Sequence, residues 1–224
     1  SQVLRDAGVA TTTFVAYGEL GRSGLGRDFA QVVDVPARPG QSFALSADVV
    51  EHMVAHLATP HDGPRFLFAH WMDPHFPYDA AAKKGPAYQR FLAEVELADT
   101  SFGVLWDALE RQGLLARRVL IVTADHGEAF GHHGTPYHTV TVYEELIRVP
   151  LFIYAPGVRP RRIDAPVTLM DLGPTLLDLF SLPTPAAFLG ESLVPFARGE
   201  VPKLTRPIAA ERPRTRALVL GQRK

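Results

Sequence analysis

The fold class of this 224-residue chain follows from the stretch VLIVTADHGE, residues 119–128. Its first five residues form an unbroken run of apolar and β-branched side chains, which is typical of a strand buried on both faces. A polar turn with a glycine follows at once. Because parallel α/β sheets bind ligands beyond the carboxyl ends of their strands, Asp125 and His126 stand where a site is expected.

Strand-like and helix-like segments alternate along the rest of the chain. The apolar pattern predicts strands at residues 9–17, 65–70 and 149–154, helices at 46–57, 88–112 and 171–180, and a loop at 18–40. Ser46 is the expected N-cap of the first of these helices, and Gly113 is the expected stop of the second. This alternation predicts an α/β fold, a three-layer sandwich with a largely parallel central sheet flanked by helices.

Composition excludes several classes of protein. Hydrophobic residues make up 46% of the chain and charged residues 21%, with a formal net charge of −1. Such a balance does not favour a nucleic-acid binder or a membrane-surface protein. No apolar run approaches the roughly 18 residues that a membrane span needs. The chain has no cysteine, so disulfides and thiolate metal sites are excluded within it.

Asp125 and His126 offer a carboxylate and an imidazole side by side at a strand end. Both could reach one cation, and this donor set suits Ca²⁺, Mg²⁺, Mn²⁺ or Zn²⁺. Gly127 lets the backbone turn close to such a site. The alternative is a structural turn in which Asp125 caps a following helix.

Two further segments carry histidines. Residues 70–78, HWMDPHFPY, leave a predicted strand, and their two prolines hold His75 at a fixed exit from the sheet. Residues 131–138 contain three histidines, including His133 and His138. An imidazole can donate to an anion or protonate a leaving group near neutral pH. The alternative for both segments is a solvated surface loop.

Together these segments resemble the sulfatase branch of the alkaline phosphatase superfamily. The resemblance covers almost the whole chain, and its motifs stand in the family's order. They are the helix-to-strand unit at 3–11, the histidine-rich element at 66–78, the Asp-His-Gly-Glu element at 114–128, and the segments at 143–151, 171–177 and 190–193.

The resemblance implies a role for each candidate residue. Asp125 and His126 match the family's later pair of metal ligands, and the implied metal is Ca²⁺, with Mg²⁺, Mn²⁺ or Zn²⁺ as alternatives. His75 matches the histidine that contacts the sulfuryl group, and His138 falls where the family places a Lys or His over the substrate anion. His133 matches the histidine of a Gly-Glu-His-Gly stretch.

The chain also departs from the family pattern. The early strand with its acidic pair is absent, and so is the Cys-x-Pro-x-Arg or Ser-x-Pro-x-Arg segment whose Cys or Ser becomes the formylglycine nucleophile. Residues 23–27 have Ser and Arg at that spacing, but they lack the proline and follow the 3–11 unit. We therefore expect a chain truncated at both ends: a partial α/β domain at 1–199 and the start of a small C-terminal subdomain at 200–224.

The implied activity is metal-dependent hydrolysis of a sulfate ester, on a small molecule or a glycan, in a longer parent enzyme. We expect the 224 residues alone to be inactive, because the nucleophile is not among them. One alternative is a phosphodiesterase, phosphonate hydrolase or phosphoethanolamine transferase of the same superfamily; another is a non-catalytic binding protein or a gene fragment. We further expect Asp125, His126, His75 and His138 to converge on one concave face.

Overall fold

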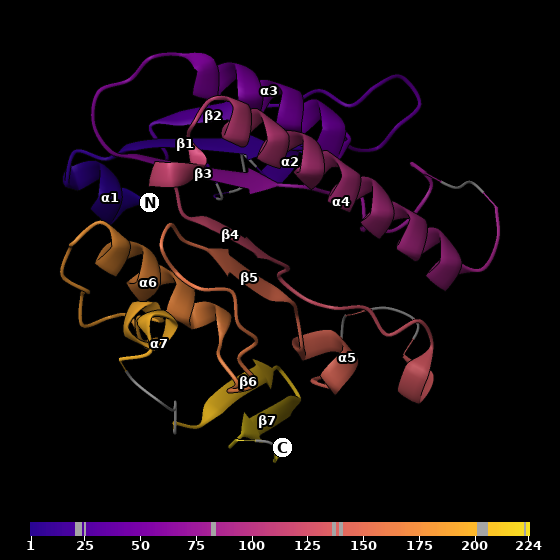
Figure 1. The fold of residues 1–224 in the computed structure, drawn as a ribbon. Coiled ribbons are helices and arrows are strands. Elements are labelled where there is room, and N and C mark those ends of the chain that lie inside the picture. Colours follow the sequence, from indigo (N-terminus) through magenta and orange to yellow (C-terminus); the bar gives the residue numbers. More distant parts are fainter. Residues whose placement is uncertain are drawn as a thin grey trace. The chain divides into compact units, whose positions relative to one another are not determined.

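The computed structural model describes residues 1–20, 24, 26–81, 84–135, 138, 141–200, 206–221 and 223–224. The chain divides into two compact units, Ser1–Leu115 and Ala116–Lys224, and each is described by itself (Figure 1). Ser23 and Leu25 of the rejected nucleophile motif lie outside the described residues. So do residues 136 and 137 of the histidine-rich stretch and residues 201–205 of the tail.

A parallel three-stranded sheet forms the first unit. Helix α1 (Gln2–Asp6) leads into β1 (Ala10–Val15), which lies between β2 (Gln31–Asp34) and β3 (Arg65–His70), and both pairs are parallel. The β-branched and aromatic side chains of β1 suit this central place, and five of its six residues are buried. Val15 pairs with His70, so the carboxyl ends of β1 and β3 lie together.

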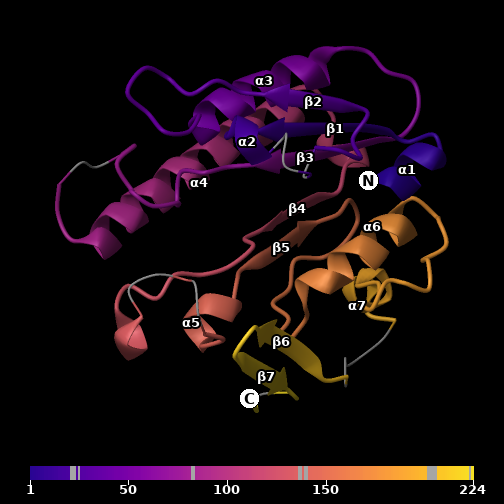
Figure 2. The same ribbon diagram turned by 180° about the vertical axis from the view of Figure 1, so that it is seen from behind.

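Two helices lie side by side in this unit, as both ribbon views show (Figures 1 and 2). They are α3 (Ser46–Ala58) and α4 (Ala87–Arg111), and α3 also contacts β1. Helix α3 buries the apolar stripe Val49, Val50 and Met53. Gly113 follows α4 with φ +64, which confirms the predicted stop.

The sequence prediction was wrong at two places in the first unit. Residues 18–40 are not all loop, since they contain the short helix α2 (Gly18–Leu20) and strand β2. β2 is a four-residue edge strand whose side chains are mostly exposed, so it lacks the apolar run of a buried strand. Ser46 is not the N-cap of α3: Leu45 is, and the Ser46 hydroxyl instead contacts Asp73 and Ser101.

The second unit opens with β4 (Leu120–Thr123), which pairs with β5 (Leu151–Tyr154). Both strands were predicted, but they run antiparallel, so among the described strands only β1, β2 and β3 pair in parallel. The connection between them contains η3 (His132–Gly134) and α5 (Glu144–Ile147). The predicted helix at 171–180 is confirmed as η4 (Leu169–Asp171) followed by α6 (Leu172–Leu179).

The end of the chain contributes α7 (Val194–Arg198) and a hairpin of β6 (Ile208–Arg212) and β7 (Thr215–Val219). Strand β7 overlaps the short apolar run at residues 217–220, whereas β6 was not predicted from the sequence. The expected boundary between residues 199 and 200 stays a prediction.

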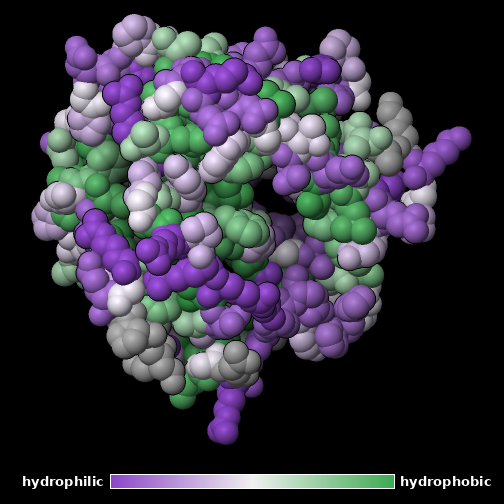
Figure 3. Space-filling view, viewed as in Figure 1, coloured by the Kyte–Doolittle hydropathy of each residue, from purple (hydrophilic) through white to green (hydrophobic). Residues whose placement is uncertain are grey.

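Hydrophobic residues lie among hydrophilic ones on the visible surface (Figure 3). Large exposed hydrophobic side chains include Leu189 at 80% exposure and Phe152 of β5 at 67%. Strand β5 therefore presents an aromatic ring to solvent. Within the part of the chain that is described, none of the helices combines the length and the apolar character needed to span a bilayer.

Candidate functional site

Asp125 and His126 follow directly on β4, as predicted. The Asp125 carboxylate is 75% exposed, and its Oδ2 lies 3.8 Å from Nε2 of His126. Nδ1 of His126 lies 2.9 Å from the Gly127 carbonyl oxygen. Because a carbonyl only accepts, Nδ1 carries a hydrogen, so Nε2 is the nitrogen that bears the lone pair when the ring is neutral.

No helix begins at Asp125, so the helix-cap alternative is wrong. Oδ1 of Asp125 accepts a bond of 3.0 Å from the adjacent His126 amide, and residues 126–130 are not helical. Gly127 then passes close to α5: its amide donates to Leu146 O at 2.9 Å. A Cβ at this position would lie 2.0 Å from the Glu145 carbonyl oxygen, so only glycine fits the turn.

Glu128 is a site residue to which the sequence assigned no role. Its side chain is 9% exposed, and its Oε2 lies 3.1 Å from Nδ1 of His138. The His138 ring in turn stacks on His126, with centroids 4.1 Å apart and planes 21° apart. The motif does name Glu128, but nothing in a loop sequence indicates that it meets a histidine ten positions later.

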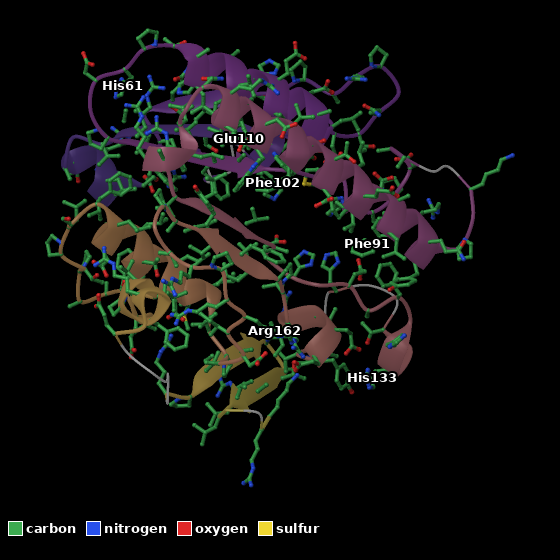
Figure 4. All side chains as sticks on the ribbon, viewed as in Figure 1. His61, Phe91, Phe102, Glu110, His133 and Arg162 are labelled. Atoms are coloured by element: carbon green, nitrogen blue, oxygen red, sulfur yellow. The ribbon has the colours of Figure 1, made fainter. Side chains whose placement is uncertain are left out.

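His133 has different neighbours. Its Nδ1 lies 2.8 Å from Oε1 of Glu145, and its ring stacks on Tyr143 at 4.0 Å. The pKa of Glu145 is lowered, first by its own backbone amide and then by the His133 contact. His133 belongs to the short helix η3 (Figure 4). These contacts tie the residue to the segment that begins α5.

His75 belongs to the first unit, in the loop that leaves β3. Its Nδ1 lies 2.7 Å from the Phe76 carbonyl oxygen, which fixes the hydrogen on Nδ1. The ring edge meets Phe43 at a centroid distance of 5.4 Å. Beside His75 lies a shallow hollow with about 300 Å³ of empty space, part of it open to solvent, lined also by Phe43 and Asp79. His75 therefore stands at a concave surface.

The same loop is anchored by Asp73, which is 5% exposed. Both of its carboxyl oxygens accept from the Ser46 amide at 3.0 Å, and the Ser46 hydroxyl lies 3.0 Å from Oδ1. Burial raises the pKa of Asp73, and the bonds from Ser46 oppose that rise only in part. The loop is thereby held against the first turn of α3.

Of the predicted site residues, the structure groups Asp125, His126 and His138, and it adds Glu128 to them. Among the described residues, no set of three or more His, Asp or Glu side chains has the arrangement of a metal site. Asp125 and His126 nevertheless fit two places in a coordination shell. Their Oδ2 and Nε2 are adjacent, and the Gly127 carbonyl holds His126 in the tautomer that a metal ligand needs.

The family model described as Sulfatase matches residues 1–182. The chain therefore belongs to the sulfatase family. Members of this family generally depend on a divalent metal.

The curated relatives agree with this assignment. The chain is 36% identical to Arylsulfatase K of Bos taurus over 98 residues, which is 43% of this chain and 18% of the relative. It is 30% identical to Endo-4-O-sulfatase of Bacteroides thetaiotaomicron over 135 residues, covering 59% and 27%. These matches span about a fifth to a quarter of the length of the relatives.

A solved structure shows the fold. A protein of the alkaline phosphatase superfamily from Vibrio parahaemolyticus matches with a TM-score of 0.74 at 17% identity. The match covers 100% of this chain and 58% of that protein. The alkaline phosphatase-like fold predicted from the sequence is thereby confirmed.

Proposed function

We propose that this chain supplies part of the active site of an enzyme that hydrolyses sulfate esters. Asp125 and His126 bind a divalent cation, for which we propose Ca²⁺, with Mg²⁺, Mn²⁺ or Zn²⁺ as alternatives. His75 and His138 contact the sulfuryl group, and His133 has a lesser role near it. The substrate is a sulfate ester of a small molecule or a glycan.

The observation that carries the proposal is the geometry of His126. Its Nδ1 hydrogen is committed to the Gly127 carbonyl at 2.9 Å, so Nε2 is left as a lone-pair donor 3.8 Å from Asp125 Oδ2. A neutral imidazole held by a carbonyl beside an exposed carboxylate has the properties of a metal-ligand pair. When bound there, a divalent cation would offset negative charge on the transferring group.

His138 supports the anion-binding half of the proposal. Its Nδ1 faces the Glu128 carboxylate at 3.1 Å, so the carboxylate holds a proton on that nitrogen and orients the ring. When the ring also carries a proton on Nε2, that N–H is the donor through which His138 contacts a sulfuryl oxygen. The His75 ring is oriented in the same way: its Nδ1 faces the Phe76 carbonyl oxygen, and its Nε2 is directed away from that oxygen.

A group of this kind can hold an anion or give a proton to a leaving alcohol, and such acid catalysis contributes about 10²–10⁴-fold. The formylglycine that the family uses as nucleophile would supply the attack on sulfur, and the 224 residues contain neither a Cys nor a matching Ser-x-Pro-x-Arg segment. These histidines therefore position and protonate, while the bond to sulfur is made by a group outside this chain.

The metal half is tested by line broadening in NMR spectra of the 224-residue chain, since two ligands alone are expected to bind weakly. Substoichiometric Mn²⁺ should broaden the His126 ring signals, and added Ca²⁺ should restore them. Asp125→Asn should abolish the effect, whereas Asp164→Asn, at an exposed carboxylate paired with Arg162, should not. Equal broadening in wild type and Asp125→Asn would refute the metal site.

A further inference from the structure

Two side chains of α4 hold the backbone of the segment that follows His75. Nη1 of Arg90 donates to the carbonyl oxygens of Pro77 at 2.6 Å and of Tyr78 at 3.1 Å. One helical turn further on, Oε1 of Glu94 accepts from the Ala81 amide at 2.9 Å. One face of helix α4 therefore holds both ends of residues 77–81 by hydrogen bonds.

Glu94 is an unusual residue for such a contact, because its carboxyl group is completely buried. It is 0% exposed, and its Oε2 has no hydrogen-bond partner among the described groups. A buried carboxyl group is costly unless its hydrogen bonds form. The Ala81 amide offsets part of that cost only while residues 77–81 stay against α4. The position of this segment and the burial of Glu94 are therefore coupled.

A third contact fixes the same segment. Tyr78 has a φ of +57 and is 4% exposed, and its ring meets Phe91 of α4 at a centroid distance of 5.8 Å. Phe91 lies on the same helix as Arg90 and Glu94 (Figure 4). A non-glycine residue with positive φ persists only where its surroundings hold it, and here α4 provides them.

His75 depends on this segment through one carbonyl. The Phe76 oxygen that fixes the His75 tautomer stands directly before Pro77, whose own carbonyl accepts from Arg90. The backbone also closes on itself, because the Tyr78 amide donates to His75 O at 3.2 Å. A shift of residues 77 and 78 would therefore carry the Phe76 carbonyl away from Nδ1 of His75.

We propose that Arg90 and Glu94 are positioning residues for His75, holding residues 77–81 so that the Phe76 carbonyl keeps one hydrogen on Nδ1 and the ring takes its second proton on Nε2, which then donates to the substrate. The inference rests on the proposed function in taking His75 as a group that faces the sulfuryl oxygens. Neither α4 residue touches the substrate itself.

The test reads the His75 tautomer from ring ¹⁵N chemical shifts of the 224-residue chain. Wild type should show the Nδ1–H form. Glu94→Leu and Arg90→Met should each give a mixture of the two neutral tautomers, because the Phe76 carbonyl is no longer held. Glu94→Gln keeps a carbonyl acceptor for the Ala81 amide and should restore the wild-type shifts.

Glu96→Leu, at an exposed position of the same helix, is the matched control and should leave His75 unchanged. If Glu94→Leu does not fold, Arg90→Met decides the question alone, since Arg90 is only half-buried. Wild-type His75 shifts in a folded Arg90→Met variant would overturn the proposal.

A sulfate titration separates this inference from the proposed function. Inorganic sulfate should shift the His75 ring signals of wild type at millimolar concentration and should do so less in Arg90→Met. If sulfate does not shift the His75 ring signals of wild type, the proposed role of His75 in binding the sulfuryl group is wrong. The tautomer measurement still decides whether Arg90 and Glu94 position the ring.

Discussion

Asp73 and Glu94 are carboxyl groups that the first unit keeps away from water, at 5% and 0% exposure. Burial is the main cause that raises the pKa of each. Amide bonds from Ser46 and Ala81 oppose the rise, and the charge of Asp73 adds to it at Glu94. The folded chain therefore keeps protons at these groups at a pH where the unfolded chain has released them.

This sets the sign of a pH dependence. Because both folded pKa values are raised, the stability they contribute is full below the ordinary carboxyl pKa of about 4 and is lost as the pH rises through the folded values. The urea midpoint of wild type should fall over that interval, and Glu94→Gln should flatten the fall. Glu96→Gln, with an exposed carboxylate, should follow wild type. Identical slopes in Glu94→Gln and wild type would contradict this account.

At the scale of elements, the turn after β4 is fitted to α5 through Gly127. A Cβ there would stand 2.0 Å from Glu145 O, and that oxygen is backbone and cannot swing aside. The close packing of Gly127 against α5 therefore fixes the position of Asp125 and His126.

Gly127→Ala should lower the free energy of unfolding by about 1–3 kcal/mol, the range for an overpacked site. Gly103→Ala is the control: this α4 glycine has nothing within 4 Å of a built Cβ, so alanine should stabilise by about 0.5–1 kcal/mol. Urea denaturation measures both. A Gly127→Ala variant as stable as wild type would show that the turn is not packed against α5 as described.

Elements with a long, periodic or wholly apolar pattern were predictable from the sequence. Strands β1, β3, β4 and β5 and helix α4 all fall where the pattern places them. β2 was missed because a four-residue edge strand need not be apolar. The antiparallel direction of β5 was missed because an apolar run has the same composition whether its strand pairs in parallel or antiparallel.

The candidate site was likewise predictable from the sequence only in part. Asp125 and His126 stand next to the end of β4, and His75 stands in the loop that follows β3, both of which the sequence locates. Two other contacts join residues that are not neighbours in the chain: Glu128 with His138, and α4 with residues 77–81. In each case at least one partner lies in a loop, where the sequence has no periodic pattern. Such contacts depend on tertiary packing, so local pattern could not give them.

At the scale of the molecule, Asp171 connects three segments near the end of the second unit by hydrogen bonds. It is 0% exposed, and its carboxylate accepts from the amides of Thr168 and Glu191, each at 2.9 Å, and from Arg206. Arg206 stands just before the β6–β7 hairpin. The buried charge is therefore balanced by a residue from the tail.

Arg206→Ala should cost about 3–5 kcal/mol in unfolding free energy, because it leaves a buried carboxylate without its cation. Arg216→Ala removes an exposed partner of Glu211 and should cost at most about 1 kcal/mol. Thermal or urea unfolding compares the two. Equal small losses would mean that Arg206 is not the partner on which Asp171 depends.

The proposal that Asp125 and His126 hold a divalent cation beside His138 is tested most directly by paramagnetic broadening with Mn²⁺. All three residues belong to the second unit, and the His138 ring stacks on His126 with centroids 4.1 Å apart. The account predicts that Mn²⁺ broadens the ring signals of His126 and His138 together and that Asp125→Asn abolishes both effects. Unchanged ring signals in wild type, or equal broadening in Asp125→Asn, would contradict it.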